Sequence, residues 1–176
     1  MRLATSAAIA TTLLMAHPLS ARAGGRAPCA TLSAAHVAVD TAAHRLFLCG
    51  ARGALERSYS VRLARDGPGK SRAGDGKVPL GVYPLGAPRR SKPFGMFIPI
   101  GYPTPEQRRR GYTGGSVGIH GPDRRVRWLG WLVNTFDTTD GCVGLAFDSE
   151  MEEISVWLRR TKARRIVLHD QADGAR

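Results

Sequence analysis

VGIHGPDRRVRWLGWLVNTFDTTDGCVGL, residues 117–145, is the stretch that decides how this chain is interpreted. It contains a histidine followed by glycine, His120-Gly121, and then a cysteine preceded by glycine, Gly141-Cys142. A neutral thiol is a poor nucleophile, but an imidazole can take its proton, and glycines let backbone amides approach a reacting carbonyl. We therefore predict that Cys142 attacks a peptide carbonyl and that His120 is its base. Such a pair can rest as thiolate and imidazolium, because the imidazolium lowers the thiol pKa.

Each of these residues alone also has a structural explanation. A cysteine beside glycine is often an inert, buried small side chain, and a histidine at the end of a strand often only forms a hydrogen bond. The two together favour a cysteine enzyme that transfers acyl groups. Three roles remain open for Asp140: it orients His120, binds an acceptor ammonium, or points outward. An anion beside a thiolate raises the thiol pKa, which argues against a direct catalytic role.

The N-terminus has the features of a secretory signal peptide. Arg2 and an uncharged apolar run over residues 3–15 precede Ala21-Arg22-Ala23, which matches a small-x-small cleavage site. We expect residues 1–23 to be removed and residues 24–176 to form a single, monomeric domain exported to the periplasm or cell envelope. The apolar run is shorter than the roughly 20 residues that span a bilayer, and no later segment is long and apolar enough, so we expect no membrane span.

The charge balance is strongly basic. The chain has 26 Lys and Arg against 14 Asp and Glu, and the net charge without residues 1–23 is +10. Such a balance attracts polyanions, but an exported protein rarely meets nucleic acid, so we expect cell-wall material as the partner and no nucleic acid. The scattered arginines are also typical of a solvated surface. No metal-binding motif is present, Gly67-x-Gly69-Lys70 lacks the spacing of a phosphate-binding loop, and we expect no cofactor.

The three cysteines are an odd number. In an oxidising compartment two can pair and leave one thiol free. Cys29 and Cys49 lie outside any glycine-rich motif, whereas Cys142 lies inside one. We expect a Cys29–Cys49 disulfide and a free Cys142; the alternative is that Cys49 is an ordinary strand residue and Cys29 is unpaired.

Short alternating apolar runs separated by glycine and proline predict a mainly β domain. The residues 36–39 and 45–49 should form a hairpin, and 117–120 a buried strand that carries His120 at its end. Pro99 places the run 94–100 at a sheet edge. Other strands are expected at residues 58–63, 81–85 and 165–169.

One helix is expected in the C-terminal half, after residue 148. Ser149-x-x-Glu152 matches a capping box, and an apolar face follows at helical spacing. That face consists of Met151, Ile154, Trp157 and Leu158. The predicted fold is therefore a β-sandwich or partly closed barrel with one helix.

The two motifs resemble the hallmark of the L,D-transpeptidase catalytic domain, the YkuD family: His-Gly, a gap, then Ser-His-Gly-Cys-Ile/Val-Arg. Upstream, Gly69-Lys70 and the segment 74–83 (GDGKVPLGVY) look like the family's Gly-Asp…Thr-Pro-x-Gly-x-Tyr segment. The resemblance covers roughly residues 36–169 and implies an L,D-transpeptidase-like fold.

Residue by residue, the resemblance makes Cys142 the nucleophile and His120 the group that activates it. It makes Gly141, with the amide of Cys142, part of the oxyanion hole, and it places Gly121 beside His120. The chain departs from the motif at three positions: Thr139 replaces Ser, Asp140 replaces His, and Gly144 replaces Arg. Thr-Asp-Gly-Cys is similar to one branch of the family, the YafK-like group.

The resemblance implies an L,D-transpeptidase that acts on peptidoglycan stem peptides through a thioester, in cell-wall biogenesis and cell shape. Two alternatives remain: a hydrolase on the same fold, either an L,D-carboxypeptidase or an amidase that releases wall-linked peptide or lipoprotein, and an inactive wall-binding module. Between the two motifs, Trp128, Trp131 and Phe136 either line a substrate groove or belong to the core.

Overall fold

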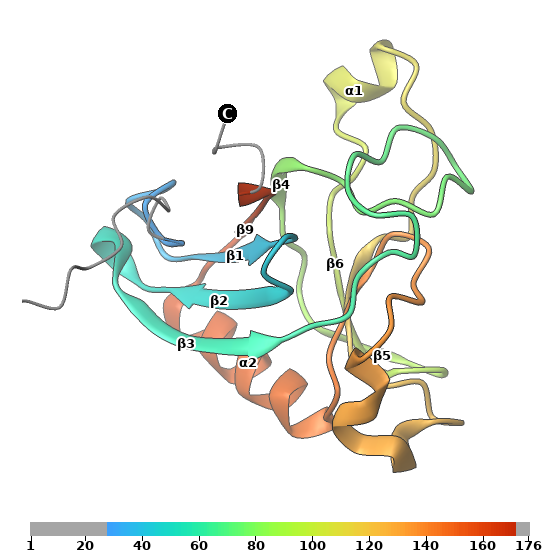
Figure 1. Ribbon diagram of the computed structural model, residues 1–176. Helices are drawn as coiled ribbons and strands as arrows, with labels where there is room; N and C mark the ends of the chain where they lie inside the picture. Colours follow the sequence, from blue (N-terminus) through green and yellow to red (C-terminus); the bar gives the residue numbers. More distant parts are fainter. Residues whose placement is uncertain (1–27, 172–176) are drawn as a thin grey trace, which may run out of the picture.

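Two mixed β-sheets form the body of the protein in the computed structural model, which describes residues 28–171 (Figure 1). The predicted signal peptide, residues 1–23, lies outside the described residues. The larger sheet has the order β3-β2-β1-β9-β4, and the smaller one has the order β5-β6-β7-β8. The mainly β prediction is confirmed, and in the described part of the chain the strands do not close into a barrel.

The larger sheet begins with the predicted hairpin. β1 (His36–Asp40) pairs antiparallel with β2 (Arg45–Cys49) and parallel with β9 (Arg165–His169), so β1 is central and buried throughout. The outer strands are β3 (Leu55–Ser60) and β4 (Gly81–Pro84). A disulfide joins Cys29 to Cys49 and packs with Ala38 of β1.

The smaller sheet carries the two motifs. It consists of β5 (Arg89–Ser91), β6 (Gly95–Pro99), β7 (Gly118–His120) and β8 (Val143–Gly144). The prediction that Pro99 marks an edge strand is wrong, because β6 pairs with both β5 and β7. Pro99 is the last residue of β6, and its carbonyl accepts a hydrogen bond from the amide of Gly86 at 2.8 Å.

The segment after β3 crosses from the larger sheet to the smaller one. The predicted strand 58–63 is displaced: β3 ends at Ser60, yet Val61 and Leu63 remain buried. Arg62 exchanges two backbone hydrogen bonds of 2.9 Å with Gly144, so this segment extends the smaller sheet beyond β8. The apolar alternation continues because burial continues, although the pairing partner changes.

The predicted helix is α2 (Asp148–Thr161), which lies against the sheets with its apolar face in the core (Figure 1). The predicted capping box is wrong. Glu150, rather than Glu152, reaches back to accept from the amides of Ala146 and Phe147 at 3.1 Å, so the helix begins before Ser149. A short helix, α1 (Pro105–Arg109), and 3-10 segments at Ala51–Gly53 and Arg127–Asn134 complete the described elements. No described helix is long and apolar enough to cross a membrane.

The disulfide provides a first prediction. It closes a loop of 20 residues between Cys29 and Cys49, and a crosslink of that length restricts the unfolded chain by about 3 kcal/mol. Replacing both cysteines with alanine should lower the free energy of unfolding by roughly that amount, as measured by urea denaturation. An unchanged urea midpoint would contradict this prediction, and the alkylation rate of Cys142 serves as a control for an intact site.

Candidate active site

The pairing of β7 with β8 brings the two motifs together. These strands run parallel, with Ile119 opposite Val143 and His120 opposite Gly144. The amide of Leu145 donates to the carbonyl of His120 at 2.8 Å, which fixes the register at the end of β7. His120 and Cys142 consequently line one cavity of about 520 Å³. The cavity is also lined by Arg62, Phe94, Gly115, Ser116, Val117, Asp123, Arg125, Thr138, Thr139 and Asp140.

The thiol of Cys142 is the one free cysteine within residues 28–171 and is partly buried. Its Sγ donates to the carbonyl of Ser116, 3.6 Å away. Burial raises the thiol pKa, and the Gly118 backbone opposes this shift; the charge of Asp140 raises the pKa further, and the charges of Lys70 and Arg62 lower it. The resting form is therefore the neutral thiol.

His120 is held rigidly and is also neutral. Its ring is 3% exposed and stacks on Phe94, with 3.9 Å between the ring centroids. Nδ1 lies 2.7 Å from the carbonyl of Gly121 and donates to it, which assigns the free lone pair to Nε2. Burial lowers the pKa of His120 to about 4, and nearby Arg62 lowers it as well, although the Gly121 and Asp123 contacts oppose the shift.

These shifts do not agree with the thiolate–imidazolium pair expected from the sequence. Burial disfavours the charged form of both groups, so the cavity favours a neutral thiol beside a neutral imidazole. An imidazole with a free Nε2 can still accept the proton as the sulfur attacks, which is general-base catalysis. The geometry therefore supports the predicted roles of nucleophile and base with a different resting charge.

The turn that carries Cys142 requires Gly141. This residue has a φ of +136°, and a Cβ added there would lie 2.9 Å from the carbonyl oxygen of Lys77. Thr139 closes the turn, because its Oγ1 donates to the carbonyl of Cys142 at 2.8 Å and accepts from the amide of Gly141 at 3.3 Å. The side chain of Thr139 thus holds the turn in shape. The amide of Gly141, implied as an oxyanion donor, is bound to Thr139 in the resting structure.

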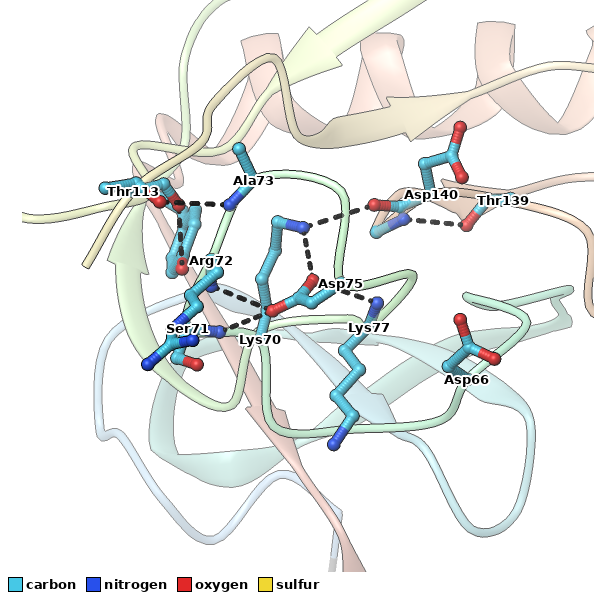
Figure 2. Close-up of polar contacts among 12 residues, drawn as sticks. Asp66, Lys70, Ser71, Arg72, Ala73, Asp75, Lys77, Thr113, Thr139 and Asp140 are labelled. Carbon is cyan, nitrogen blue, oxygen red and sulfur yellow. Dashed lines mark hydrogen bonds and ion pairs between the residues drawn. The ribbon is translucent and has the colours of Figure 1, made fainter.

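An ion pair between buried Lys70 and half-buried Asp75 supports this turn (Figure 2). The Nζ of Lys70 lies 2.7 Å from Oδ1 of Asp75 and 3.3 Å from the carbonyl oxygen of Asp140. Asp75 also accepts from the amides of Ser71, Arg72 and Lys77, at 2.8, 2.8 and 3.2 Å. Burial alone would raise the pKa of Asp75, but these hydrogen bonds hold it well below its ordinary value. Lys70 therefore tethers the catalytic turn to the loop 70–77.

Asp140 points outward. Its exposed carboxylate forms an ion pair with Nη1 of Arg65 at 2.5 Å, and among the described contacts none joins it to His120. The first of the three roles left open by the sequence, orienting His120, has no support among the described contacts; the exposure of Asp140 agrees with the third, and binding of an acceptor ammonium stays a prediction. Its remaining influence on the site is electrostatic, because its charge raises the pKa of Cys142.

The aromatic residues between the motifs lie on the surface. Trp128 is 78% exposed, Trp131 and Phe136 are nearly as exposed, and none of the three lines the catalytic cavity. The alternative that they belong to the core is wrong, because Trp128 and Trp131 lie on an exposed 3-10 segment and Phe136 follows it. That they line a substrate groove stays a prediction. Sequence reasoning also missed Phe94, Ser116 and Arg62. Within residues 28–171 no cluster of His, Cys, Asp and Glu is suited to a metal ion.

One family model matches most of the chain. The model of the YkuD family, described as the L,D-transpeptidase catalytic domain, matches residues 34–168. No curated protein was found to match the chain.

Several solved structures share the fold. The helical cell shape determining protein Pgp2 from Campylobacter jejuni has a TM-score of 0.64 at 21% identity, over 78% of this chain and 48% of that protein. Bd1075 from Bdellovibrio bacteriovorus has a TM-score of 0.55 at 20% identity, over 79% and 49% of the two chains. The catalytic domain of an E. faecium L,D-transpeptidase has a TM-score of 0.50 at 14% identity, over 79% and 99%. The chain spans about half the length of Pgp2 and Bd1075.

The raised thiol pKa yields a prediction on reactivity. The alkylation rate of Cys142 with iodoacetamide should keep rising up to and beyond about pH 8.5, the ordinary thiol pKa, because burial disfavours the reactive thiolate. Mass spectrometry of the protein with its disulfide intact measures this rate, with free cysteine as the reference. A rate that reaches its plateau by about pH 7 would indicate a resting ion pair instead.

The Lys70–Asp75 pair yields a prediction on stability. Asp75→Asn leaves the buried ammonium of Lys70 without its carboxylate, so the free energy of unfolding at pH 7 should fall by about 3–5 kcal/mol. Lys70→Met is the matched variant, and it should cost less because Asp75 keeps three backbone donors. Urea denaturation measures both.

The same pair predicts a pH dependence. The pKa of Asp75 is lower in the folded protein than in the unfolded chain. Ionised Asp75 therefore stabilises the fold above its ordinary pKa, and this stabilisation is lost as the pH falls below about 4. The difference in stability between wild type and Asp75→Asn should therefore narrow at pH 3. A constant difference, or a larger loss for Lys70→Met, would show that the ion pair does not hold the turn.

Proposed function

The chain belongs to the YkuD family of L,D-transpeptidase catalytic domains, and on that premise we propose that it is a cysteine-dependent L,D-transpeptidase acting on peptidoglycan stem peptides. The observation that carries the proposal is the placement of Cys142 and His120 in one cavity, with Nδ1 of His120 held by Gly121. This arrangement leaves Nε2 free to accept a proton. The similarity to the Thr-Asp-Gly-Cys branch remains a prediction.

The first half of the proposed reaction forms a thioester. The Sγ of Cys142 attacks the carbonyl carbon of the donor stem peptide while its proton passes to Nε2 of His120. The amide C–N bond then breaks, and the departing amine takes the proton from His120. The donor acyl group is now joined to Cys142, and His120 is neutral again.

The second half determines the product. An amine of a neighbouring stem peptide attacks the thioester, loses its proton to His120, and forms a new cross-link while the thiol is regenerated. Water in place of the amine gives hydrolysis, which is the carboxypeptidase or amidase alternative. We propose transfer as the main reaction. Similarity in fold to Pgp2, a helical cell shape determining protein, supports a role in wall remodelling and cell shape.

We also propose that the protein works as a monomer outside the cytoplasm, in the periplasm or cell envelope. The disulfide between Cys29 and Cys49 supports this location, because such bonds persist in oxidising compartments. The basic surface supports contact with anionic wall material.

The test is the reaction of the purified protein with disaccharide-tetrapeptides, followed by mass spectrometry. Wild type should form cross-linked dimers and should be acylated by a carbapenem at Cys142. Cys142→Ala should form no product, and His120→Ala should lose roughly 100- to 10,000-fold in rate. His44→Gln is the matched control, because His44 lies outside the cavity and bonds Asp137.

Other outcomes identify the alternatives. Thiol-dependent loss of a terminal residue or of an attached peptide, without dimers, would assign the hydrolase. No thiol-dependent product, with Cys142→Ala binding sacculi as well as wild type, would assign the inactive wall-binding module.

A further inference from the structure

The catalytic cavity contains a buried guanidinium for which the predicted mechanism has no use. Arg62 is 5% exposed and lines the cavity beside Cys142 and His120. Its Nη1 donates to the carbonyl of Leu145 at 3.2 Å. A guanidinium has five N–H donors, and among the described residues no other hydrogen bond and no ion pair of this side chain is found.

A buried charge without a partner is unusual, because burial is costly unless an opposite charge compensates it. Arginine cannot escape this cost by losing its proton under ordinary conditions. The acidic group that acts on Arg62 from nearby is Asp123. Its carboxylate is already bound by Arg125, whose Nη2 and Nε lie 2.9 and 3.2 Å from it. Arg62 is therefore a positive charge held ready for an anion inside the cavity.

Gly144 makes room for this side chain. A Cβ added at Gly144 would lie 2.8 Å from Cγ, Nε and Cζ of Arg62, and its three nearest neighbours all belong to that residue. Gly144 is also the position at which the family motif has arginine. A side chain at position 144 and the present side chain of Arg62 would occupy the same space. The chain thus has no arginine at position 144. The guanidinium of Arg62 lies against that position instead.

We propose that Arg62 binds a carboxylate of the stem peptide, namely the terminal carboxylate of the residue released in the first half-reaction, and thereby replaces the arginine missing at position 144. This inference rests on the proposed function. Arg62 acts electrostatically on His120 and on Cys142, so it lies near both reacting groups. His120 protonates the departing amine, and in an amino acid the carboxylate is only two bonds from the nitrogen. A guanidinium beside His120 is therefore placed to hold the carboxylate of the leaving residue.

The consequence is a choice of donor. A peptide that ends one residue after the cleaved bond presents its carboxylate to Arg62, whereas an amidated peptide presents no charge. Arg62 is in this view a substrate-binding residue that determines specificity, and it takes no part in proton transfer.

Binding measurements test this choice without turnover. Titration calorimetry with Cys142→Ala protein should show that a free-acid tetrapeptide binds at least tenfold more tightly than its C-terminal amide. Adding Arg62→Gln should abolish the preference by weakening the acid alone, and Arg62→Lys should retain part of it. Arg57→Gln, at an exposed arginine on β3 outside the cavity, should leave the preference unchanged. Equal affinity for acid and amide, or no affinity for either, would overturn the inference.

Moving the arginine from position 62 to position 144 tests whether Arg62 replaces the arginine of the family motif. Arg62→Ala and Gly144→Arg should each lower kcat/KM for the free-acid donor by at least tenfold, the first by loss of the charge and the second by the overlap at Gly144. The double variant Arg62→Ala/Gly144→Arg should recover at least tenfold over each single variant. Thermal unfolding identifies variants that do not fold, for which the binding test decides. A folded double variant no better than Arg62→Ala would overturn the replacement.

Turnover distinguishes this inference from the proposed function. A wild-type protein that prefers the free acid in binding but forms no thiol-dependent product would refute the proposed enzyme and support the anion site. A protein that forms cross-links equally well from acid and amide donors would refute the anion site and support the enzyme.

Discussion

The parallel pairing of β7 with β8 is the contact on which the site depends. His120 and Cys142 are 22 residues apart in sequence, yet their strands are adjacent, with His120 opposite Gly144. A shift of one residue in this register would turn alternate side chains to the other face of the sheet and separate the two groups. The surrounding structure holds the register: Leu145 bonds the His120 carbonyl, and Arg62 bonds Gly144 from the other side.

Burial determines the charges in the cavity. It favours the neutral forms of the thiol and the imidazole, because removal from water disfavours an isolated ion of either kind. The permanently charged side chains around Cys142 and His120 differ in whether an opposite charge compensates them. Lys70 is compensated by Asp75, and Asp140 is paired with Arg65 at the surface. Buried Arg62 has no ion pair among the described contacts, and the carboxylate of nearby Asp123 is bound by Arg125. A site that is neutral at its reacting atoms and positive at one wall is suited to an anionic peptide.

Local patterns were sufficient for much of this molecule, and long-range packing explains the errors. The hairpin, the strand ending at His120 and the last strand follow from alternation over a few residues. Pro99 does not reveal that its strand is paired on both sides, and the exposure of Trp128 depends on where the 3-10 segment lies. Arg62 falls between two buried apolar residues, where alternation suggests solvent. The crossing of this segment to the smaller sheet buries Arg62, and no pattern within residues 58–63 contains that information.

The three positions around Cys142 that depart from the family motif are all contacted by one segment. Residues 62–75 pass along the catalytic turn and contact it at each changed position: Arg62 fills the space over Gly144, and Arg65 pairs with the carboxylate of Asp140. Arg65 also donates its amide to the carbonyl of Thr139. A charge that a motif lacks at one position can therefore be supplied by a segment packed against it, as Arg62 packs against Gly144. The charges beside these positions belong to Arg62 over Gly144 and to Arg65, which is paired with Asp140.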